Sequence, residues 1–162
     1  MEYLHITHPF SPVFDINSEI LILGSFPSVK SRETDFYYGH PQNRFWRVIA
    51  AIYGIDVPVS IEEKTNLLLK NHLALWDVIE NCDIRGSSDS SIRNAAATDL
   101  QMILGKAKIR RVYANGKKAA ALYRKYQYEK TGIDVITLPS TSPANAAWSL
   151  ERLTEAWSIL IQ

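Results

Sequence analysis

The feature that most restricts the fold of this chain is a short, continuous apolar run over residues 18–24, which ends in glycine. A strand without polar alternation is typical of a parallel sheet that is covered on both faces. Similar runs occur over residues 111–116 and 133–139, and a weaker one over residues 73–77. The sequence therefore predicts four strands of a mostly parallel sheet.

Helical periodicity occupies the segments between these runs. Phe45, Ile49 and Ile52 repeat at helical spacing after Pro41, a residue that suits a first helical turn. Further helices are predicted over residues 61–70, 98–106 and 117–126, and from Leu150 to the end, with Leu150, Leu153, Trp157 and Ile161 on one face. Strands that alternate with helices form crossovers covering both faces of a sheet. We expect an α/β fold, a three-layer α/β/α sandwich with a mostly parallel four-stranded central sheet, and residues 1–162 as a single domain.

The composition excludes several classes of protein. Cys82 is the only cysteine, so neither a disulfide framework nor a cysteine-ligated iron–sulfur cluster can form within one chain. The four histidines lack the spacing of zinc ligands, and we expect no metal and no cofactor. The chain begins without a signal-peptide pattern and has no apolar stretch approaching 18 residues. We expect a cytoplasmic protein without a membrane partner, and a monomer by default.

The charge distribution indicates nucleic acid only weakly. The formal net charge is +1, but nine basic residues and a single acidic one lie between Lys106 and Lys130. Phosphate contacts by Lys and Arg supply most non-specific affinity for DNA. A basic run of this kind is, however, more often a solvated helix face.

Four segments follow the predicted strands, and they are where a ligand is expected. In open parallel sheets, ligands bind beyond the carboxyl ends of the strands. The segments cover residues 24–46, 77–94, 115–116 and 139–146, and all are polar, aromatic or rich in small residues. We expect them to be loops that converge on one pocket.

The segment 24–28, Gly-Ser-Phe-Pro-Ser, is neither a Walker loop nor a dinucleotide fingerprint, because the required lysine and further glycines are absent. It would let the backbone approach a planar or phosphorylated ligand, although an ordinary turn is the simpler interpretation. In the segment 35–46, aromatic side chains precede Asn43, which we expect in the first turn of a helix. Asn43 could orient a water, and Phe36, Tyr37 or Tyr38 could stack on a base. Core aromatics and a helix cap are the alternative.

The segment 139–146, Pro-Ser-Thr-Ser-Pro-Ala-Asn-Ala, precedes the last predicted helix. Hydroxyl and backbone N–H groups at a helix start suit phosphate oxygens, and two prolines would stiffen a wedge that fills the gap left by a flipped base. An N-cap by Ser142 or Asn145 is the alternative interpretation.

Taken together, these segments resemble the uracil-DNA glycosylase superfamily, and within it the hypoxanthine (deoxyinosine) DNA glycosylase branch. Residues 24–28 stand where the superfamily has its first active-site motif. Residues 40–46, His-Pro-Gln-Asn-Arg-Phe-Trp, are similar to a segment of the mismatch-specific uracil/thymine branch, and residues 138–145 occupy the place of the second motif. The resemblance spans nearly the whole chain, in the expected strand and helix context.

The resemblance implies a function and a catalytic residue. Phe26 stands where many relatives have a water-positioning Asn or Asp, which argues against ordinary uracil excision. The deoxyinosine branch similarly lacks that residue and depends on a later asparagine, which corresponds here to Asn43. The expected activity is that of a deoxyinosine glycosylase in base-excision repair, and the expected partner is DNA containing deaminated bases.

The expected mechanism is base flipping followed by hydrolysis of the N-glycosidic bond. Asn43 would hold the attacking water or stabilise the sugar cation through its carbonyl dipole, while Phe26 and Tyr37 sandwich the base. Ser25 and Asn115 are the other expected base contacts. The expected DNA contacts are Ser28, Lys117, Lys118, Ser140, Thr141, Ser142 and Asn145. No matching motif places a lysine near the sugar, so the enzyme should be monofunctional. Asp77 and residues 85–87 are weaker candidates.

Three other functions stay open on the sequence alone. One is a uracil/thymine mismatch DNA glycosylase, and another is a non-catalytic module that binds DNA lesions, which Phe26 in the first motif keeps possible. A hydrolase of free nucleosides would need several carboxylates around the ribose, and the loops contain few, Glu33, Asp35 and Asp77.

Overall fold

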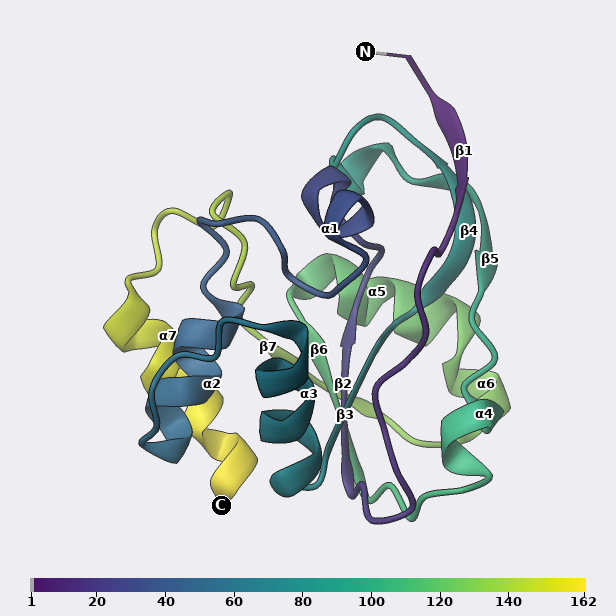
Figure 1. The fold of residues 1–162 in the computed structure, drawn as a ribbon. Coiled ribbons are helices and arrows are strands. Elements are labelled where there is room, and N and C mark those ends of the chain that lie inside the picture. The colour runs from purple at the N-terminus through teal and green to yellow at the C-terminus, as the bar shows by residue number, and fades with distance from the viewer. Residues whose placement is uncertain (1) are drawn as a thin grey trace.

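A computed structural model describes residues 2–162 and contains a parallel sheet at its centre (Figure 1). Its strands are β2 (Ile20–Gly24), β3 (Leu73–Asp77), β6 (Arg111–Asn115) and β7 (Val135–Leu138), in the order β3-β2-β6-β7. Every neighbouring pair is parallel, with Gly24 opposite Asp77 and Asn115 opposite Leu138. The predicted four-stranded parallel sheet is confirmed.

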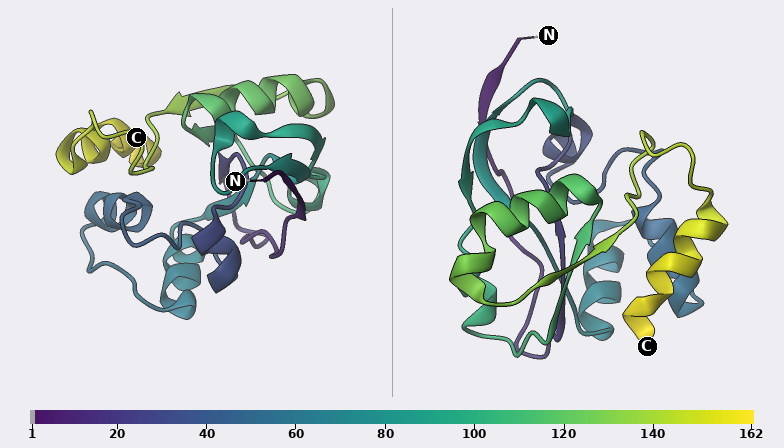
Figure 2. Two further views of the ribbon diagram at one scale, coloured as in Figure 1. Left: turned by 90° about the horizontal axis from the view of Figure 1, so that it is seen from above. Right: turned by 180° about the vertical axis from the view of Figure 1, so that it is seen from behind.

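Helices cover both faces of this sheet. They are α1 (Val29–Thr34), α2 (Phe45–Tyr53), α3 (Ile61–Lys70), α4 (Gln101–Leu104), α5 (Lys117–Tyr126), α6 (Tyr128–Thr131) and α7 (Leu150–Trp157), with short 3₁₀ turns η1 (Asp89–Ser91) and η2 (Ser158–Ile161). Figure 2 shows α5 on one face of the sheet and α3 on the other, where α2 and α7 pack side by side. This arrangement confirms the expected α/β/α sandwich.

Local sequence signals explain where several helices begin. Helix α3 starts after Ser60, whose hydroxyl accepts the N–H of Glu63 while the Glu63 carboxylate accepts the N–H of Ser60, a capping box. Helices α3 and α5 occupy the predicted ranges. Helix α4 is shorter than predicted because the hydroxyl of Thr98 donates to the carbonyl of Asp77, which holds that residue against the sheet. Helix α2 begins at Phe45, four residues after Pro41.

A second, antiparallel sheet lies beside the first and was not predicted. Its strands are β1 (Leu4–Thr7), β4 (Ile79–Ile84) and β5 (Arg93–Ala97), in the order β1-β4-β5. The expectation that residues 77–94 form a polar loop is therefore wrong. In β4, buried residues such as Cys82 alternate irregularly with half-buried polar ones such as Asp83, which is the pattern of a strand with one covered face.

The core is formed by the central sheet and the helices on both of its faces. All five residues of β2 are buried, as are Phe45 of α2 and Trp157 of α7. The prediction for the last helix holds for Leu153 and Trp157, but Leu150 and Ile161 are exposed. The chain changes to the 3₁₀ turn η2 at Ser158, and Leu160 is buried there in place of Ile161.

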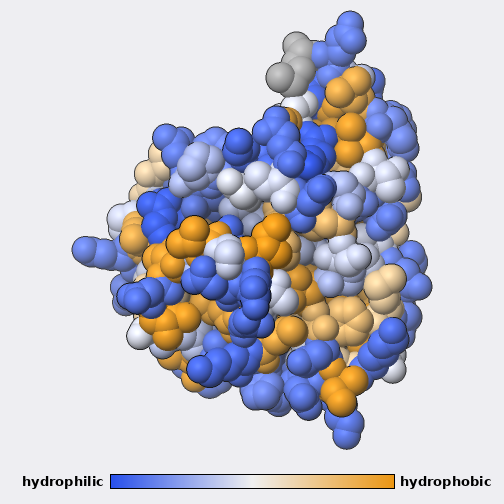
Figure 3. Space-filling model, viewed as in Figure 1, coloured by the Kyte–Doolittle hydropathy of each residue, from blue (hydrophilic) through white to orange (hydrophobic). Residues whose placement is uncertain are grey.

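On the side seen in Figure 3, hydrophilic residues surround several apolar areas. Within residues 2–162, no helix has the length and apolar character required to cross a bilayer. The same part of the chain contains no group of three or more His, Cys, Asp or Glu side chains that could hold a metal ion.

Candidate active site

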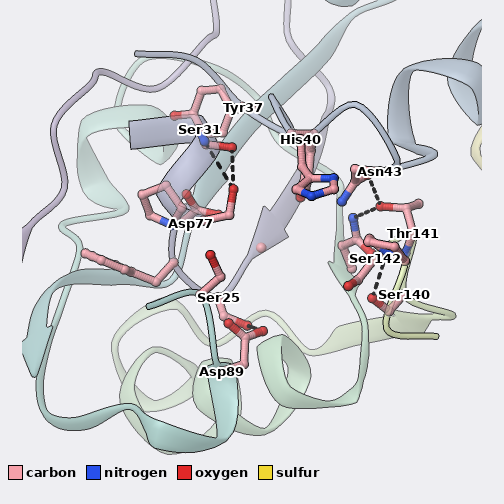
Figure 4. Close-up of a pocket in the computed structure, with 18 residues that line it drawn as sticks. Ser25, Ser31, Tyr37, His40, Asn43, Asp77, Asp89, Ser140, Thr141 and Ser142 are labelled. Atoms are coloured by element: carbon pink, nitrogen blue, oxygen red, sulfur yellow. Dashed lines mark hydrogen bonds between the residues drawn. The ribbon is translucent and has the colours of Figure 1, made fainter. Parts of the chain in front are cut away.

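A cavity of about 170 Å³ opens at the carboxyl ends of the parallel strands (Figure 4). Nine of the residues that were predicted to form the site line it, namely Ser25, Phe26, Ser28, Tyr37, Asn43, Asn115, Ser140, Thr141 and Ser142. The weaker candidates Tyr38, Asp77 and Ser87 also line it. The other lining residues were not predicted, namely Gly24, Pro27, Ser31, His40, Asp89 and Pro143. The segments that follow β2, β3, β6 and β7 therefore meet at one pocket.

Three predicted DNA-binding residues lie outside the cavity lining. Lys117 and Lys118 are exposed at the start of α5. The side-chain amide of Asn145 donates to the carbonyl of Ser140 at 3.0 Å, so it stabilises the loop that lines the cavity. Neither Ser142 nor Asn145 is the N-cap of α7, because Ser149 has that role.

Asn43 stands immediately before α2, and not in its first turn. Its Oδ1 accepts the backbone N–H of Phe45 at 2.9 Å and the hydroxyl of Thr141 at 2.9 Å. Asn43 thus satisfies one free N–H at the start of α2, although the N-cap position itself is held by Arg44, whose side chain makes no capping bond. Because both of these partners are donors to Oδ1, the orientation of the amide is determined, and Nδ2 faces the cavity (Figure 4).

This orientation corrects the expected chemistry of Asn43. We expected Asn43 to hold the attacking water, or to stabilise the sugar cation through its carbonyl dipole, but that carbonyl oxygen already accepts two hydrogen bonds. The groups that remain for a ligand are the two N–H bonds of Nδ2. Asn43 can therefore act on a ligand as a hydrogen-bond donor.

Thr141 connects Asn43 to Asn115 at the end of β6. The side-chain amide of Asn115 donates to the hydroxyl of Thr141 at 3.0 Å and accepts the backbone N–H of Thr141 at 3.0 Å. Thr141 is fully buried, so these bonds are shielded from water. These two bonds leave one N–H of the Asn115 amide for a base. The main contact of the Asn115 side chain is therefore with Thr141 in the loop that follows β7. We refer to Asn43, Thr141 and Asn115 as the amide cluster.

Arg44, which was not predicted as a site residue, fastens the loop over residues 140–148 to the start of α2. Its guanidinium donates to the backbone carbonyls of Trp148, Ser142 and Asn145. The backbone N–H of Arg44 donates to the carbonyl of Thr141 at 3.1 Å. Arg44 thus holds the partner of Asn43 in place without facing the cavity itself.

The aromatic side of the cavity is packed more tightly than expected. Tyr37 is only 2% exposed, donates its hydroxyl to the carbonyl of Ser11, and packs edge-on against Phe10. Phe26 is 7% exposed and lies edge-on to the ring of His8. Little of either ring remains free to stack, so the expected sandwich of a base between Phe26 and Tyr37 is not supported by their packing.

Asp77 lies at the end of β3, on the floor of the cavity. Its Oδ2 accepts the Nε2–H of His8 at 2.7 Å, and both side chains are buried. A Cβ at Gly24 would come within 2.4 Å of Asp77 Oδ1 and 2.9 Å of the Tyr38 hydroxyl. Gly24 is required here because these two groups approach the backbone so closely.

Asp89 of η1 provides a second carboxylate. Its Oδ2 accepts the hydroxyl of Ser25 at 3.0 Å. Burial, and next the negative charge of Asp77, raise the pKa of Asp89 to about 6, although the Ser25 hydrogen bond and the charge of Lys118 act in the opposite direction. The cavity thus contains two acids whose environments differ.

Comparison with known proteins agrees with this geometry. The family model of the Uracil DNA glycosylase superfamily matches residues 11–161. The chain belongs to the uracil DNA glycosylase superfamily. A "Hypoxanthine DNA glycosylase" of Methanosarcina acetivorans is 36% identical, over 93% of this chain and 95% of that protein. One of Methanosarcina barkeri with the same name is 34% identical, over 92% and 94%.

A solved structure shares the fold of this chain. It is the solution NMR structure of a candidate uracil DNA glycosylase from Methanosarcina acetivorans, with a TM-score of 0.79 and 32% identity. The match covers 98% of this chain and 100% of the other. The resemblance drawn from the three sequence segments, and the fold that it implied, are confirmed.

The sequence analysis did not predict that Asp89, His8 and Arg44 belong to the site, and it gave Asp77 only as a weaker candidate. Asp77 could have been found, because it is the last residue of a strand whose neighbour ends in Gly24. Arg44 adjoins Asn43 in the segment that carried the resemblance. Asp89 gives no local signal, since it reaches the cavity only through the unpredicted strand β4.

Proposed function

We propose that this chain is a DNA glycosylase that removes hypoxanthine from DNA in base-excision repair. The observation on which the proposal rests is the convergence of Asn43, Thr141 and Asn115, from three separate segments, at one cavity beyond the strand ends. The name shared by the two Methanosarcina relatives, which match over most of the chain, supports the choice of hypoxanthine.

The reaction is the hydrolysis of one bond on a flipped nucleotide. Flipping costs a few kcal/mol, and less for a mispaired base such as hypoxanthine opposite thymine. The bond between C1′ and N9 breaks with its electron pair going to the base, the oxygen of a water bonds to C1′, and the proton of that water neutralises the base. The 6-oxo group of hypoxanthine spreads the negative charge, which makes it a better leaving group than adenine.

Asn43 is the proposed catalytic residue, and it acts as a donor. Its Nδ2–H bonds can hold the oxygen of the attacking water or receive negative charge that develops on the departing base. Thr141 and the start of α2 prevent the amide from turning, so no reorganisation is required when the charge develops.

DNA contacts are proposed for the residues at the mouth of the cavity. Ser140 and Ser142 belong to the loop that would enter the gap left by the flipped base. Thr141 of the same loop was also predicted to contact DNA, but it is fully buried and supports the loop through Asn43 and Asn115. Ser28 also lines the cavity, and Lys117 and Lys118 are exposed at the start of α5 and suit phosphate. Asn115 keeps one N–H for the base, and Ser25 lines the same cavity.

The experiment that tests the function uses duplex oligonucleotides with a single hypoxanthine, xanthine or uracil, followed by cleavage of abasic sites with alkali. We expect alkali-labile product from hypoxanthine opposite thymine. Product from uracil alone would indicate a uracil glycosylase instead, and binding without product would indicate a non-catalytic module. Cleavage of free inosine but not of DNA would indicate a nucleoside hydrolase.

A second measurement tests whether the enzyme is monofunctional. No lysine lines the cavity within residues 2–162. We therefore expect no covalent complex with DNA on treatment with borohydride, because no amine is placed to form a Schiff base at C1′. A trapped complex would contradict this part of the proposal.

A further inference from the structure

Asp89 reaches the cavity from a part of the fold that supplies none of the superfamily segments identified in the sequence. It begins the turn η1, which follows β4 of the antiparallel sheet. Arg32 of α1 donates to the carbonyl of Gly86 at 2.8 Å, and the hydroxyl of Ser87 accepts the N–H of Val29 at 2.8 Å. These bonds hold the turn against α1, so Asp89 is presented from a supported position.

The two oxygens of Asp89 have different surroundings. Oδ2 accepts the hydroxyl of Ser25, which is itself only 6% exposed. No group within residues 2–162 donates a hydrogen bond to Oδ1. The carboxylate is thus oriented by one oxygen while the other is free for a ligand.

Asp77, the other carboxylate of the cavity, is less able to take a ligand. Its Oδ2 is bonded to His8, and its Oδ1 is packed close to Gly24 at the floor. Asp77 is 3% exposed, whereas Asp89 is only partly buried. Of the two acids that line the cavity, Asp89 is therefore the one with an acceptor oxygen that no hydrogen bond within residues 2–162 uses.

Asp89 and Asn43 lie on different sides of the cavity (Figure 4). If Asn43 marks the position of the sugar carbon, the base extends from there into the cavity, and its far edge carries N1 and O6. Hypoxanthine has a hydrogen on N1 and is a donor there, whereas adenine has a lone pair at N1 and is an acceptor. A carboxylate at this edge would bind the first and repel the second.

We propose that Asp89, oriented by Ser25, is a specificity-determining residue that accepts a hydrogen bond from the N1–H of a flipped 6-oxopurine. The inference depends on the proposed function, because it assumes a flipped base in this cavity. The prediction that Ser25 binds the base is thereby sharpened: Ser25 positions the carboxylate, and the carboxylate binds the base. The pKa of about 6 is consistent with this role, since Asp89 is ionised at pH 8.

The test compares hypoxanthine with 1-methylhypoxanthine, each opposite thymine in the same duplex, under single-turnover conditions at pH 8. The methyl group replaces the N1 hydrogen. We expect the wild-type protein to excise hypoxanthine about 10- to 100-fold faster, the range for a hydrogen bond to a charged group. In Asp89→Ala this ratio should fall to about threefold or less, because the acceptor is removed and the methyl group gains room.

Two further variants serve as controls. Asp89→Asn keeps the shape and one acceptor oxygen, and it should show an intermediate ratio even if the alanine variant does not fold. Asp56→Asn removes one negative charge from an exposed position between α2 and α3 that lies outside the cavity lining. It should retain both wild-type rates and their ratio.

The outcomes separate this inference from the proposed function. No excision of hypoxanthine by the wild-type protein would overturn the function, and the inference with it. Excision of hypoxanthine with an equal rate for the 1-methyl base would overturn only the inference. The inference would also be overturned if Asp89→Ala kept the wild-type ratio of the two excision rates, because Asp89 would then not act by binding N1–H. If Asp89→Ala is inactive on both bases, the same ratio in Asp89→Asn decides in its place.

Discussion

The cavity has two sides of different chemistry. On one side, the amide cluster of Asn43, Thr141 and Asn115 is neutral, and its members hydrogen-bond one another in a continuous chain. On the other side, Asp77 and Asp89 bring two acids into the same pocket, and the charge of the first raises the pKa of the second. The amide side holds its geometry at any ordinary pH, whereas the carboxylate side changes with protonation.

This difference suggests a division of tasks. A neutral network whose members orient one another, while the N–H bonds of Asn43 stay free for a ligand, suits groups that must stabilise charge at the moment of bond cleavage. A partly buried carboxylate destabilises the fold but selects strongly between a donor and an acceptor on a ligand. We therefore assign bond cleavage to the amide cluster and base selection to the carboxylate side.

The largest expected effect concerns Asn43. Asn43→Asp keeps an oxygen for Phe45 and Thr141 but has no N–H, so it should lower hypoxanthine excision by about 100-fold or more, as should Asn43→Ala. Single-turnover rates measure the loss, and circular dichroism checks the fold. Near-normal activity in Asn43→Asp together with loss in Asn43→Ala would show that the oxygen matters and not the donor.

The next effect tests whether the amide cluster acts as a unit. Thr141→Val has nearly the same shape but cannot donate to Asn43 or accept from Asn115, so the amide of Asn43 should gain freedom. We expect excision to fall by about tenfold, the size of one buried hydrogen bond. Thr137→Val, at an exposed position of β7, is the matched control. Equal rates in the two variants would mean that Asn43 does not depend on Thr141.

A smaller effect is expected at Arg44, which supports the amide cluster from outside the cavity. Arg44→Lys keeps the charge but cannot reach the carbonyls of Ser142, Asn145 and Trp148 together. We expect a loss of about 1–2 kcal/mol in the free energy of unfolding, from denaturant titration, and a severalfold lower excision rate. Arg110→Lys, at an exposed position outside the cavity lining, should change neither quantity.

The smallest effect concerns the carboxylate side and is a gain in stability. Because the pKa of Asp89 is raised to about 6, its ionisation destabilises the folded state above pH 6, and this cost is relieved as the pH falls from 6 towards 3.8. Asp89→Asn should therefore be more stable than wild type at pH 8, on the order of 1 kcal/mol, with a smaller gain at pH 5.

Denaturant titrations of both proteins at the two pH values measure this difference. Other titratable groups lie near Asp89, namely Asp77, Lys118, Tyr38, Cys82 and His40, and they remain in both proteins. The comparison therefore isolates Asp89. A variant that is less stable than wild type at pH 8 would show that the Ser25 hydrogen bond outweighs the cost of burial.

Much of the central fold could be predicted because the relevant signals are local. The apolar run of β2 and the periodicity of α3 and α5 involve residues close in sequence, and each was placed correctly. Strand β4 was missed because it has only one covered face, and its polar residues resemble those of a loop. The start of α2 was misplaced because residues 41–42 form a turn, in which the N–H of Asn43 donates to the carbonyl of His40, and the helix begins only after it.

The sequence by itself determined the parallel sheet, the family and the candidacy of Asn43, since these depend on residue patterns within short segments. The tertiary structure decided which atom of Asn43 faces the cavity, because its partner Thr141 lies 98 positions away. It also placed Asp89 beside Ser25, 64 positions apart, and His8 beside Asp77, 69 positions apart. Contacts at such separations arise from packing and leave no periodic signal in the chain.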